Sequence, residues 1–149
     1  MEIRLAQSSD IGPFVQLRAD FVRALGSLPD RASFIAATSA YLERHLNDDL
    51  LVRLAVDGER IAATAMLQMY ATPPRPGCQN GKNALLMNVW TAPDDRRRGL
   101  ARRVVETLIA DAREREVGMI LLDYTDEGLH LYRQLGFQPR DREMALRLV

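Results

Sequence analysis

The sequence predicts an α/β fold with layers of the α+β type: a mixed, mostly antiparallel central sheet flanked by helices, with a parallel β-α-β crossover. Three observations support this prediction. Two helical segments come early, a pair of apolar strands with a hairpin turn follows, and a buried strand, a helix and another buried strand come next. At 149 residues the chain fits a single domain, 1–149.

The first half begins with a short strand and two helices. Residues 2–6 alternate as a strand, and "SSD" then offers an N-cap to a helix over 10–25, which Gly26 ends. A second helix is expected over 31–46, where apolar residues recur at helical spacing.

The next two segments predict a β-hairpin and a long loop. "LLVRLAV" and "ERIAATAMLQMYA" are apolar strands, and Asp57-Gly58 between them favours a two-residue turn. The segment 72–82 is dense in proline, glycine and asparagine, so we expect a loop there.

From Ala84 onward the pattern changes to strand, helix, strand. "ALLMNVWT" and "GMILLDYT" are expected to be buried strands, and the helix between them runs to about Val117. This spacing is typical of a right-handed crossover between parallel strands. A short helix over 127–134 and a final strand, "EMALRLV", are expected to follow. One face of that strand would carry Met144, Leu146 and Leu148.

Composition excludes several classes of function. Lysine and arginine number 20, as do aspartate and glutamate, so no global field attracts nucleic acid or an anionic membrane. A single cysteine, Cys78, excludes an internal disulfide framework, and His45 and His130 are too far apart for zinc spacing. The sequence starts without a leader pattern and has no apolar run of roughly 20 residues, so a cytoplasmic protein is expected.

Arg96, Arg97 and Arg98 stand where the central helix begins. A helix N-terminus carries partial positive charge, so arginines there are unfavourable unless an anion binds. Gly99 and Ala101 let other groups approach the backbone closely, and the exposed amides of such a turn form an anion cradle. The sequence therefore predicts a phosphate site, although neither the Walker nor the dinucleotide spacing is present.

An alternative interpretation needs no ligand. The three arginines could pair with Asp94 and Asp95 and face solvent, as charge runs often do.

The stretch "NVWTAPDDRRRGLARRVVETLI" resembles the acetyl-coenzyme A motif of the GNAT superfamily of N-acetyltransferases, Gln/Arg-x-x-Gly-x-Gly/Ala after a β-strand. Downstream, "LHLYRQLGF" is similar to the family's second segment, in which a tyrosine stands four residues before Gly-Phe; here these are Tyr132 and Gly136-Phe137. The resemblance implies that residues 84–149 bind acetyl-CoA and that residues 1–83 shape the acceptor site.

Carried over by position, the resemblance implies a set of donor-binding residues. The turn would bind the pyrophosphate of coenzyme A through Arg96, Arg97, Arg98, Gly99, Leu100, Ala101 and Arg102. The pantetheine arm would pair with strand backbone at Val89, Trp90 and Thr91, and an amide near Val89 would polarise the thioester carbonyl. Tyr132 would protonate the departing thiolate.

Some positions depart from the family pattern. Thr125 stands where many members have asparagine, so pantetheine contacts from Thr125 are expected in its place, and Gly128 replaces the usual alanine. Asn88 stands on the strand where some members keep a glutamate base, which favours attack by an already neutral amine or proton loss through water. From residue type alone, Tyr132 and Trp90 also fit core positions, and Asp123 fits an exposed strand end.

The favoured function is acetyl transfer from acetyl-CoA to a primary amine of a small molecule or peptide, by direct transfer in a ternary complex and without a metal. The alternative is a non-catalytic domain that senses acyl-CoA. Nucleic-acid and membrane partners are not expected, whereas a homodimer through the final strand is possible. Acidic residues near the expected acceptor region could attract a cationic amine or simply be solvated. They are Asp20, Asp30, Glu43, Asp48 and Asp49.

Overall fold

A computed structural model of the protein describes residues 1–140 and 142–149. The strands are β1 (Glu2–Leu5), β2 (Leu50–Asp57), β3 (Arg60–Ala71), β4 (Lys82–Thr91) and β5 (Met119–Leu122). The helices are α1 (Ile11–Leu25), α2 (Arg31–His45), α3 (Leu100–Glu114) and α4 (Asp126–Gln134). Two short 3-10 turns, η1 (Ser8–Asp10) and η2 (Pro93–Asp95), precede α1 and α3.

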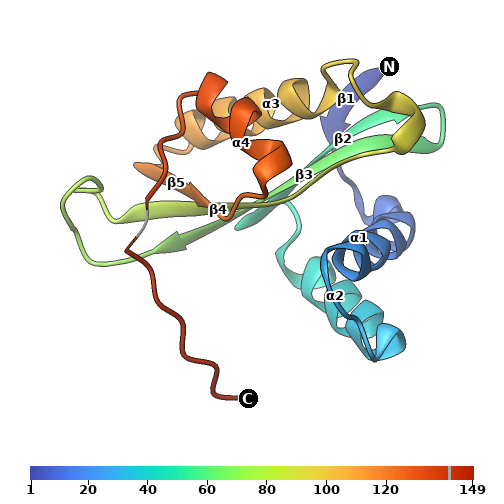
Figure 1. Ribbon diagram of the computed structural model, residues 1–149, viewed down its shortest axis with the longest axis horizontal. Coiled ribbons are helices and arrows are strands. Elements are labelled where there is room, and N and C mark those ends of the chain that lie inside the picture. Colours follow the sequence, from blue (N-terminus) through green and yellow to red (C-terminus); the bar gives the residue numbers. More distant parts are fainter. Residues whose placement is uncertain (141) are drawn as a thin grey trace.

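The strands form one sheet in the order β1-β2-β3-β4-β5, with helices on both faces (Figure 1). Neighbouring strands are antiparallel from β1 to β4, and β4 and β5 are parallel. The helix α3 makes the crossover between the two parallel strands. The predicted mixed, mostly antiparallel sheet with one β-α-β crossover is therefore confirmed.

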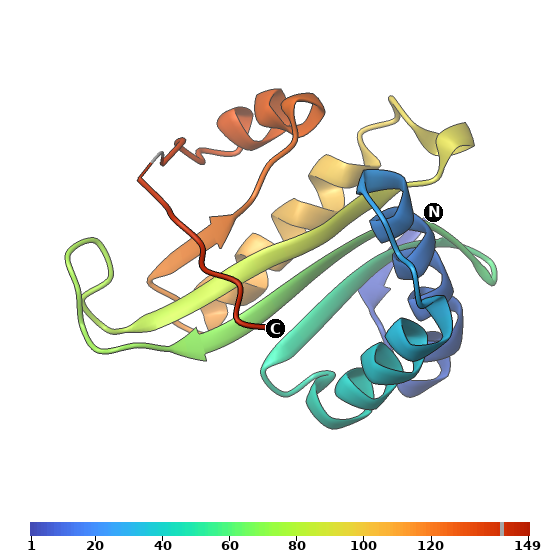
Figure 2. The ribbon, with the colours of Figure 1, turned by 60° about the horizontal axis from the view of Figure 1, so that its bottom comes forward.

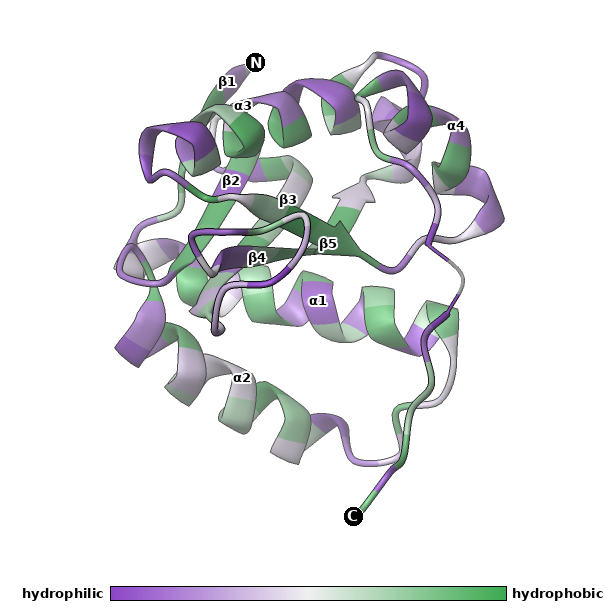
Figure 3. Cartoon of the chain, turned by 90° about the vertical axis from the view of Figure 1, so that its left-hand side faces the viewer, coloured by the Kyte–Doolittle hydropathy of each residue, from purple (hydrophilic) through white to green (hydrophobic). Residues whose placement is uncertain are grey.

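Two apolar layers form because the strands alternate. On β2, Leu51 and Ala55 pack in the cluster with α3, whereas Val52 and Leu54 pack in the cluster with α1 and α2. The central strands are coloured hydrophobic in Figure 3, and α1 and α3 lie against opposite faces of them. Both faces of the sheet are thus buried in its middle, and any site must lie at an edge or an end.

The hairpin turn lies one residue further along than predicted. Asp57 still pairs with Arg60, so the two turn residues are Gly58 and Glu59 rather than Asp57-Gly58. Gly58 has a φ of 61°, and a glycine takes that left-handed conformation without steric cost. The first turn position requires a left-handed backbone conformation, and the glycine that adopts it fixes where the chain reverses.

Two boundaries in the second half also differ from expectation. Helix α3 ends at Glu114 instead of near Val117, because Glu116 takes a left-handed φ of 60° and the amide of Val117 donates back to the Ala112 carbonyl. Strand β5 is half-buried rather than buried, because within the described sheet it has β4 on one side only.

The prediction of a final strand is wrong for the structure described. Residues 142–149 form no strand, and Met144, Leu146 and Leu148 are exposed by 100%, 84% and 84%. A strand needs a neighbour for its backbone groups, and this segment instead leads away from the sheet in Figure 1 and passes in front of the strands in the turned view of Figure 2. Alternation alone therefore did not decide the structure, and the homodimer through this segment stays a prediction.

An ion pair joins the sheet to α3. Arg53 points to the α3 face of β2, and its Nε and Nη2 atoms donate to the two carboxylate oxygens of Asp111 at 2.8 and 2.7 Å. Asp111 is buried, so this bidentate pair satisfies two charges that would otherwise be costly in an apolar layer.

We predict that Asp111→Asn lowers the free energy of unfolding by about 1–3 kcal/mol, because Arg53 loses a charged partner in the core. Urea denaturation monitored by circular dichroism measures this difference. Glu59→Gln is the control: Glu59 is exposed in the hairpin turn, and its change should stay within about 0.5 kcal/mol. Equal stability of Asp111→Asn and wild type would contradict the structural role of the pair.

Candidate active site

A bulge interrupts the pairing of β4 with β3. Thr64 pairs with Trp90 and Met66 with Met87, so Ala65 on β3 faces both Asn88 and Val89. Asn88 has a φ of 54°, a left-handed conformation that asparagine tolerates better than most residues. The bulge therefore turns the backbone at Val89 away from the regular ladder.

A network of side chains holds the bulge in place. The Thr64 hydroxyl donates to the Asn88 carbonyl at 2.9 Å and accepts from the Asn88 side-chain amide at 3.0 Å. Arg18 of α1 donates from Nη1 to the Asn88 Oδ1 atom at 3.1 Å. Thr64 and Asn88 are both buried, so these bonds fix the bulge from within the core.

The bulge coincides with a divergence of β4 from β5. Their pairing runs from Asn83 opposite Met119 to Leu86 opposite Leu122 and stops there, because β5 ends. Beyond Leu86, β4 continues to Thr91 with β3 on one side and, in the described sheet, no strand on the other. The backbone edge that includes Val89, Trp90 and Thr91 is therefore open to an extended partner.

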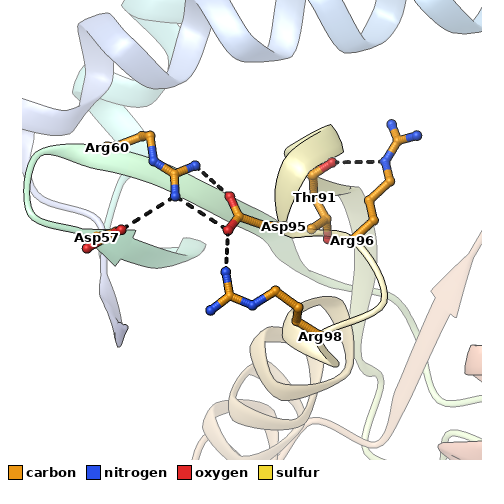
Figure 4. Close-up of polar contacts among 6 residues, drawn as sticks. All are labelled: Asp57, Arg60, Thr91, Asp95, Arg96 and Arg98. Carbon is orange, nitrogen blue, oxygen red and sulfur yellow. Dashed lines mark hydrogen bonds and ion pairs between the residues drawn. The ribbon is translucent and has the colours of Figure 1, made fainter.

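The turn between β4 and α3 is organised around Asp95, as Figure 4 shows. Asp95 is 2% exposed, and it accepts hydrogen bonds from Arg60 at 2.5 Å and from Arg98 at 2.6 Å. The hydrogen bond from Arg60 is the main cause that lowers the pKa of Asp95, and the charge of Arg98 acts in the same direction. One buried carboxylate thus ties the hairpin at Arg60 to the start of α3.

Exposed amides follow immediately after Asp95. Arg97 and Gly99 have φ values of 61° and 73°, and Gly99 is the N-cap of α3. The backbone N–H groups from Arg97 to Arg102 donate to no carbonyl or side chain within the described residues. Such consecutive free amides at a helix N-terminus favour a bound anion.

The arginine side chains of this turn divide into two groups. Arg98 pairs with Asp95, and Arg102 pairs with Glu106 at 2.9 Å, so the ligand-free interpretation holds in part. The Arg96 side chain donates only to the Thr91 carbonyl, at 3.4 Å (Figure 4). Arg97 is exposed, and its side chain makes no hydrogen bond to the described residues. Arg96 and Arg97 are therefore the arginines of this triplet that remain available to an anion.

Tyr132 lies on α4, half-buried against the apolar layer that contains α3. Its ring meets Phe137 edge-on, with 5.9 Å between centroids, and burial raises the pKa of its hydroxyl above the usual range. No described residue hydrogen-bonds to that hydroxyl. The phenol is therefore a neutral donor at physiological pH. Packing holds its ring in place, and its hydroxyl has no partner among the described residues.

Gly128 has a packing role that the sequence pattern alone did not indicate. A Cβ atom at this position would lie 2.8 Å from the Tyr132 Cε2 atom, too close for a real contact. The Tyr132 ring therefore folds over Gly128, which explains a glycine where the resemblance leads one to expect alanine.

Apart from Trp90, which directly follows the bulge on β4, the other residues singled out from the sequence lie away from the bulge. Thr125 is exposed at the N-cap of α4, Asp123 and His130 are exposed, and Trp90 packs partly in the α1 and α2 layer. A cleft of about 1130 Å³ beside β5 is lined by residues of α3 and α4 and by residues 135–140 and 143–145. It contains Tyr132 but none of the turn residues after Thr91.

The acidic residues considered for the acceptor are mostly engaged elsewhere. Asp20 pairs with Arg31 at 2.8 Å, Asp30 caps α2 through the amide of Ser33, and the Asp49 carboxylate accepts from the Nδ1–H of His45 at 2.8 Å. Glu43 is exposed, and Asp48 lies in the short turn after α2. These positions favour solvated or capping roles.

Arg18 is the residue that sequence reasoning missed. Its guanidinium lies 5.6 Å from the ring centroid of Phe34 on α2 and donates to Asn88 on β4. The signal was present in the spacing, because Arg18 stands three and four residues after the buried Val15 and Phe14. A charged residue on the core-facing side of an amphipathic helix is unusual, and it indicates a structural or functional role for that residue.

The sequence pattern of the acetyltransferase (GNAT) family matches residues 16–137. The chain belongs to this family. No curated protein gives a significant match.

Solved structures of acetyltransferases share the fold of this GNAT chain. A predicted acetyltransferase from Clostridium acetobutylicum, determined with acetyl-CoA, is 26% identical with a TM-score of 0.89, covering 98% of this chain and 95% of that one. A GCN5-related N-acetyltransferase from Ralstonia eutropha is 22% identical with a TM-score of 0.81, covering 99% and 97%. A glucosamine-6-phosphate N-acetyltransferase from Arabidopsis thaliana is 19% identical with a TM-score of 0.75, covering 99% and 98%.

Two further properties concern the described part of this GNAT chain. Its His, Cys, Asp and Glu side chains form no group of three that could hold a metal ion. None of its described helices combines the length and apolar character that crossing a membrane requires.

We predict that Asp95→Asn destabilises the GNAT fold at neutral pH and that the difference from wild type shrinks in acid. The lowered pKa means that Asp95 contributes fully above the unfolded-state value of about 3.9 and loses its contribution as pH falls through the folded-state value. Urea denaturation at a series of pH values from about 7 to about 3 measures this.

Asp94→Asn is the matched control, because Asp94 is the exposed neighbour in the same 3-10 turn. Its difference from wild type should be small throughout that range. A difference for Asp95→Asn that stays constant down to the lowest pH would contradict the role given to the charged Asp95.

Proposed function

We propose that the protein is an acetyl-CoA-dependent N-acetyltransferase that acetylates a primary amine of a small molecule or peptide by direct transfer in a ternary complex. The observation that carries the proposal is the combination of an open β4 edge at Val89–Thr91 with free amides at Arg97–Arg102. Membership of the GNAT family and the acetyl-CoA in the Clostridium acetobutylicum structure support the identity of the donor.

The free amides and Arg96 and Arg97 suit the pyrophosphate of coenzyme A. Amides at a helix N-terminus and arginine forks both prefer phosphate oxygens, and neither group has another anion to bind in the described structure. The open backbone of Val89, Trp90 and Thr91 suits the amide groups of a pantetheine arm, which can pair as an added strand does. The residues present therefore fit the donor.

Two groups suit the chemistry at the thioester. Acetyl-CoA supplies a carbonyl carbon that the amine nitrogen attacks, after which the carbon–sulfur bond breaks and the thiolate leaves. The bulge directs backbone near Val89 out of the ladder, where an amide can stabilise charge on the carbonyl oxygen. The neutral Tyr132 hydroxyl is suited to give its proton to the departing sulfur.

Removal of the amine proton needs no strong base in this proposal. Asn88 stands on the strand where some family members keep a glutamate base, but its side chain bonds to Thr64 and Arg18 and does not titrate. An amine that reaches the site in its neutral form can attack directly, and the proton it then loses passes to water.

A free-thiol assay over a panel of amines, amino acids, aminoglycosides and peptides tests the proposal. Release of coenzyme A that depends on an acceptor, together with an acetylated product by mass spectrometry, supports it. Tight acetyl-CoA binding without thiol release from any acceptor would favour a non-catalytic acyl-CoA sensor.

We predict that Gly99→Glu weakens coenzyme A binding at least about 10-fold, because it adds a negative charge to a cradle for phosphate. Titration calorimetry measures the affinity. The matched control is Gly58→Glu, which makes the same charge change at a similar φ, also with open space around the new Cβ, in the distant β2–β3 turn. Undiminished binding by Gly99→Glu would refute the placement of the pyrophosphate.

We predict that Tyr132→Phe leaves coenzyme A affinity nearly unchanged while turnover falls about 100-fold, the lower end for general acid catalysis. The wild-type rate should decline above about pH 10, because burial raises the pKa of Tyr132 and only the protonated phenol can donate. The phenylalanine variant should lack that decline.

Tyr70→Phe is the control, since Tyr70 is an exposed tyrosine on β3. Its turnover should match wild type. Near-wild-type turnover in Tyr132→Phe, with chemistry shown to limit the rate, would leave Tyr132 a packing role only.

A further inference from the structure

Arg18 is a cation that points inward without an acidic partner. It lies on α1, whose neighbouring residues Phe14, Val15 and Ala19 are buried, and its Nη1 atom reaches Asn88 across to β4. No carboxylate in the described residues forms an ion pair with it. Elsewhere in this structure the half-buried arginines on β1 and β2, Arg4 and Arg53, each have a bidentate aspartate.

The surroundings of Arg18 orient its guanidinium without neutralising it. The Phe34 ring of α2 has its centroid 5.6 Å from the guanidinium, which favours the cation but offers its N–H groups no carboxylate or carbonyl acceptor. The Asn88 Oδ1 atom takes one N–H, and a guanidinium has several more in a fixed fork. Burial lowers the pKa of Arg18, since desolvation disfavours its charge.

The position of Arg18 places this fork beside the proposed reaction centre. Asn88 and Val89 are the two bulge residues. Arg18 hydrogen-bonds to Asn88, which directly precedes Val89, the residue near which the backbone is proposed to bind the thioester carbonyl. It approaches from the face covered by α1 and α2, whereas α3 and α4 lie on the other side of the sheet. The donor and Arg18 would thus meet the acceptor from different directions.

We propose that Arg18 binds an anionic group of the acceptor, a carboxylate or a phosphate, and so selects amines that carry a negative charge close to the reacting nitrogen. This inference rests on the proposed acetyl transfer and adds a substrate class to it. A planar anion can take two parallel N–H bonds from the fork, which would fix the amine relative to the carbonyl carbon.

Matched acceptor pairs test the inference in the free-thiol assay at saturating acetyl-CoA. One arm compares amino acids with their α-carboxamides, and the other compares phosphoethanolamine with ethanolamine and glucosamine 6-phosphate with glucosamine. The wild type should show a higher kcat/KM for the anionic member in at least one arm, and the arm that responds identifies the anion.

Variants separate anion binding from support of the bulge. Arg18→Gln should raise KM for the anionic member about 10- to 100-fold more than for the neutral member, whose smaller change measures the loss of the bond to Asn88, and Arg18→Lys should recover part of the difference. Arg23→Gln, an exposed arginine later on α1, is the control and should behave as wild type. Equal losses for both members of a pair in Arg18→Gln would overturn the inference in favour of a structural role at Asn88.

A direct binding measurement keeps the inference distinct from the proposed function. If no acceptor causes thiol release, acetyl transfer to these amines fails, and calorimetry with coenzyme A-saturated protein still compares the same pairs. Tighter binding of the anionic member that Arg18→Gln abolishes supports the inference. No preference for the anionic member, or no binding across the panel, overturns it.

Discussion

Asn88 adopts a left-handed backbone conformation inside a strand, and its side chain bonds both to the neighbouring strand through Thr64 and to α1 through Arg18. This residue has two structural effects. It holds the bulge that exposes backbone near Val89, at the place where β4 has run past the end of β5. It also links α1 to the face of the sheet on which an acceptor would approach. A residue that cannot adopt this backbone conformation or form these bonds would disturb both.

Elements with strong periodicity could be predicted from the sequence. The crossover from β4 through α3 to β5 was visible because Val104, Val105 and Leu108 repeat at helical spacing between two apolar runs, and all three are buried. The glycine-containing turn before α3 was visible for a different reason: three arginines at a helix N-terminus are electrostatically unfavourable without an anion. The amides from Arg97 to Arg102 have no acceptor among the described residues, as an anion cradle requires, and the bound anion stays a prediction.

Features that depend on distant partners could not be predicted in the same way. A pairing of Arg98 with Asp95 fits the ligand-free interpretation, but the second partner of Asp95 is Arg60, which lies 35 residues before Asp95 and carries no local signal of this contact. The contacts of Arg18 come from Phe34 on α2 and Asn88 on β4, so they could be recognised only in the folded structure. The strand prediction for the segment after α4 was wrong because it rested on the alternation of Met144, Leu146 and Leu148 alone. Alternation places apolar side chains on one face but does not provide a neighbouring strand for the backbone to pair with.

The open edge of β4 also has a thermodynamic consequence. An extended ligand that pairs with Val89–Thr91 would bind the folded chain only, because the unfolded chain has no such edge. Binding there is therefore linked to folding, and each increase in ligand concentration above the dissociation constant adds to the free energy of unfolding by mass action. A ligand that pairs with this edge would complete the sheet, and a larger supply of it would lengthen the time for which the chain resists unfolding and proteolysis.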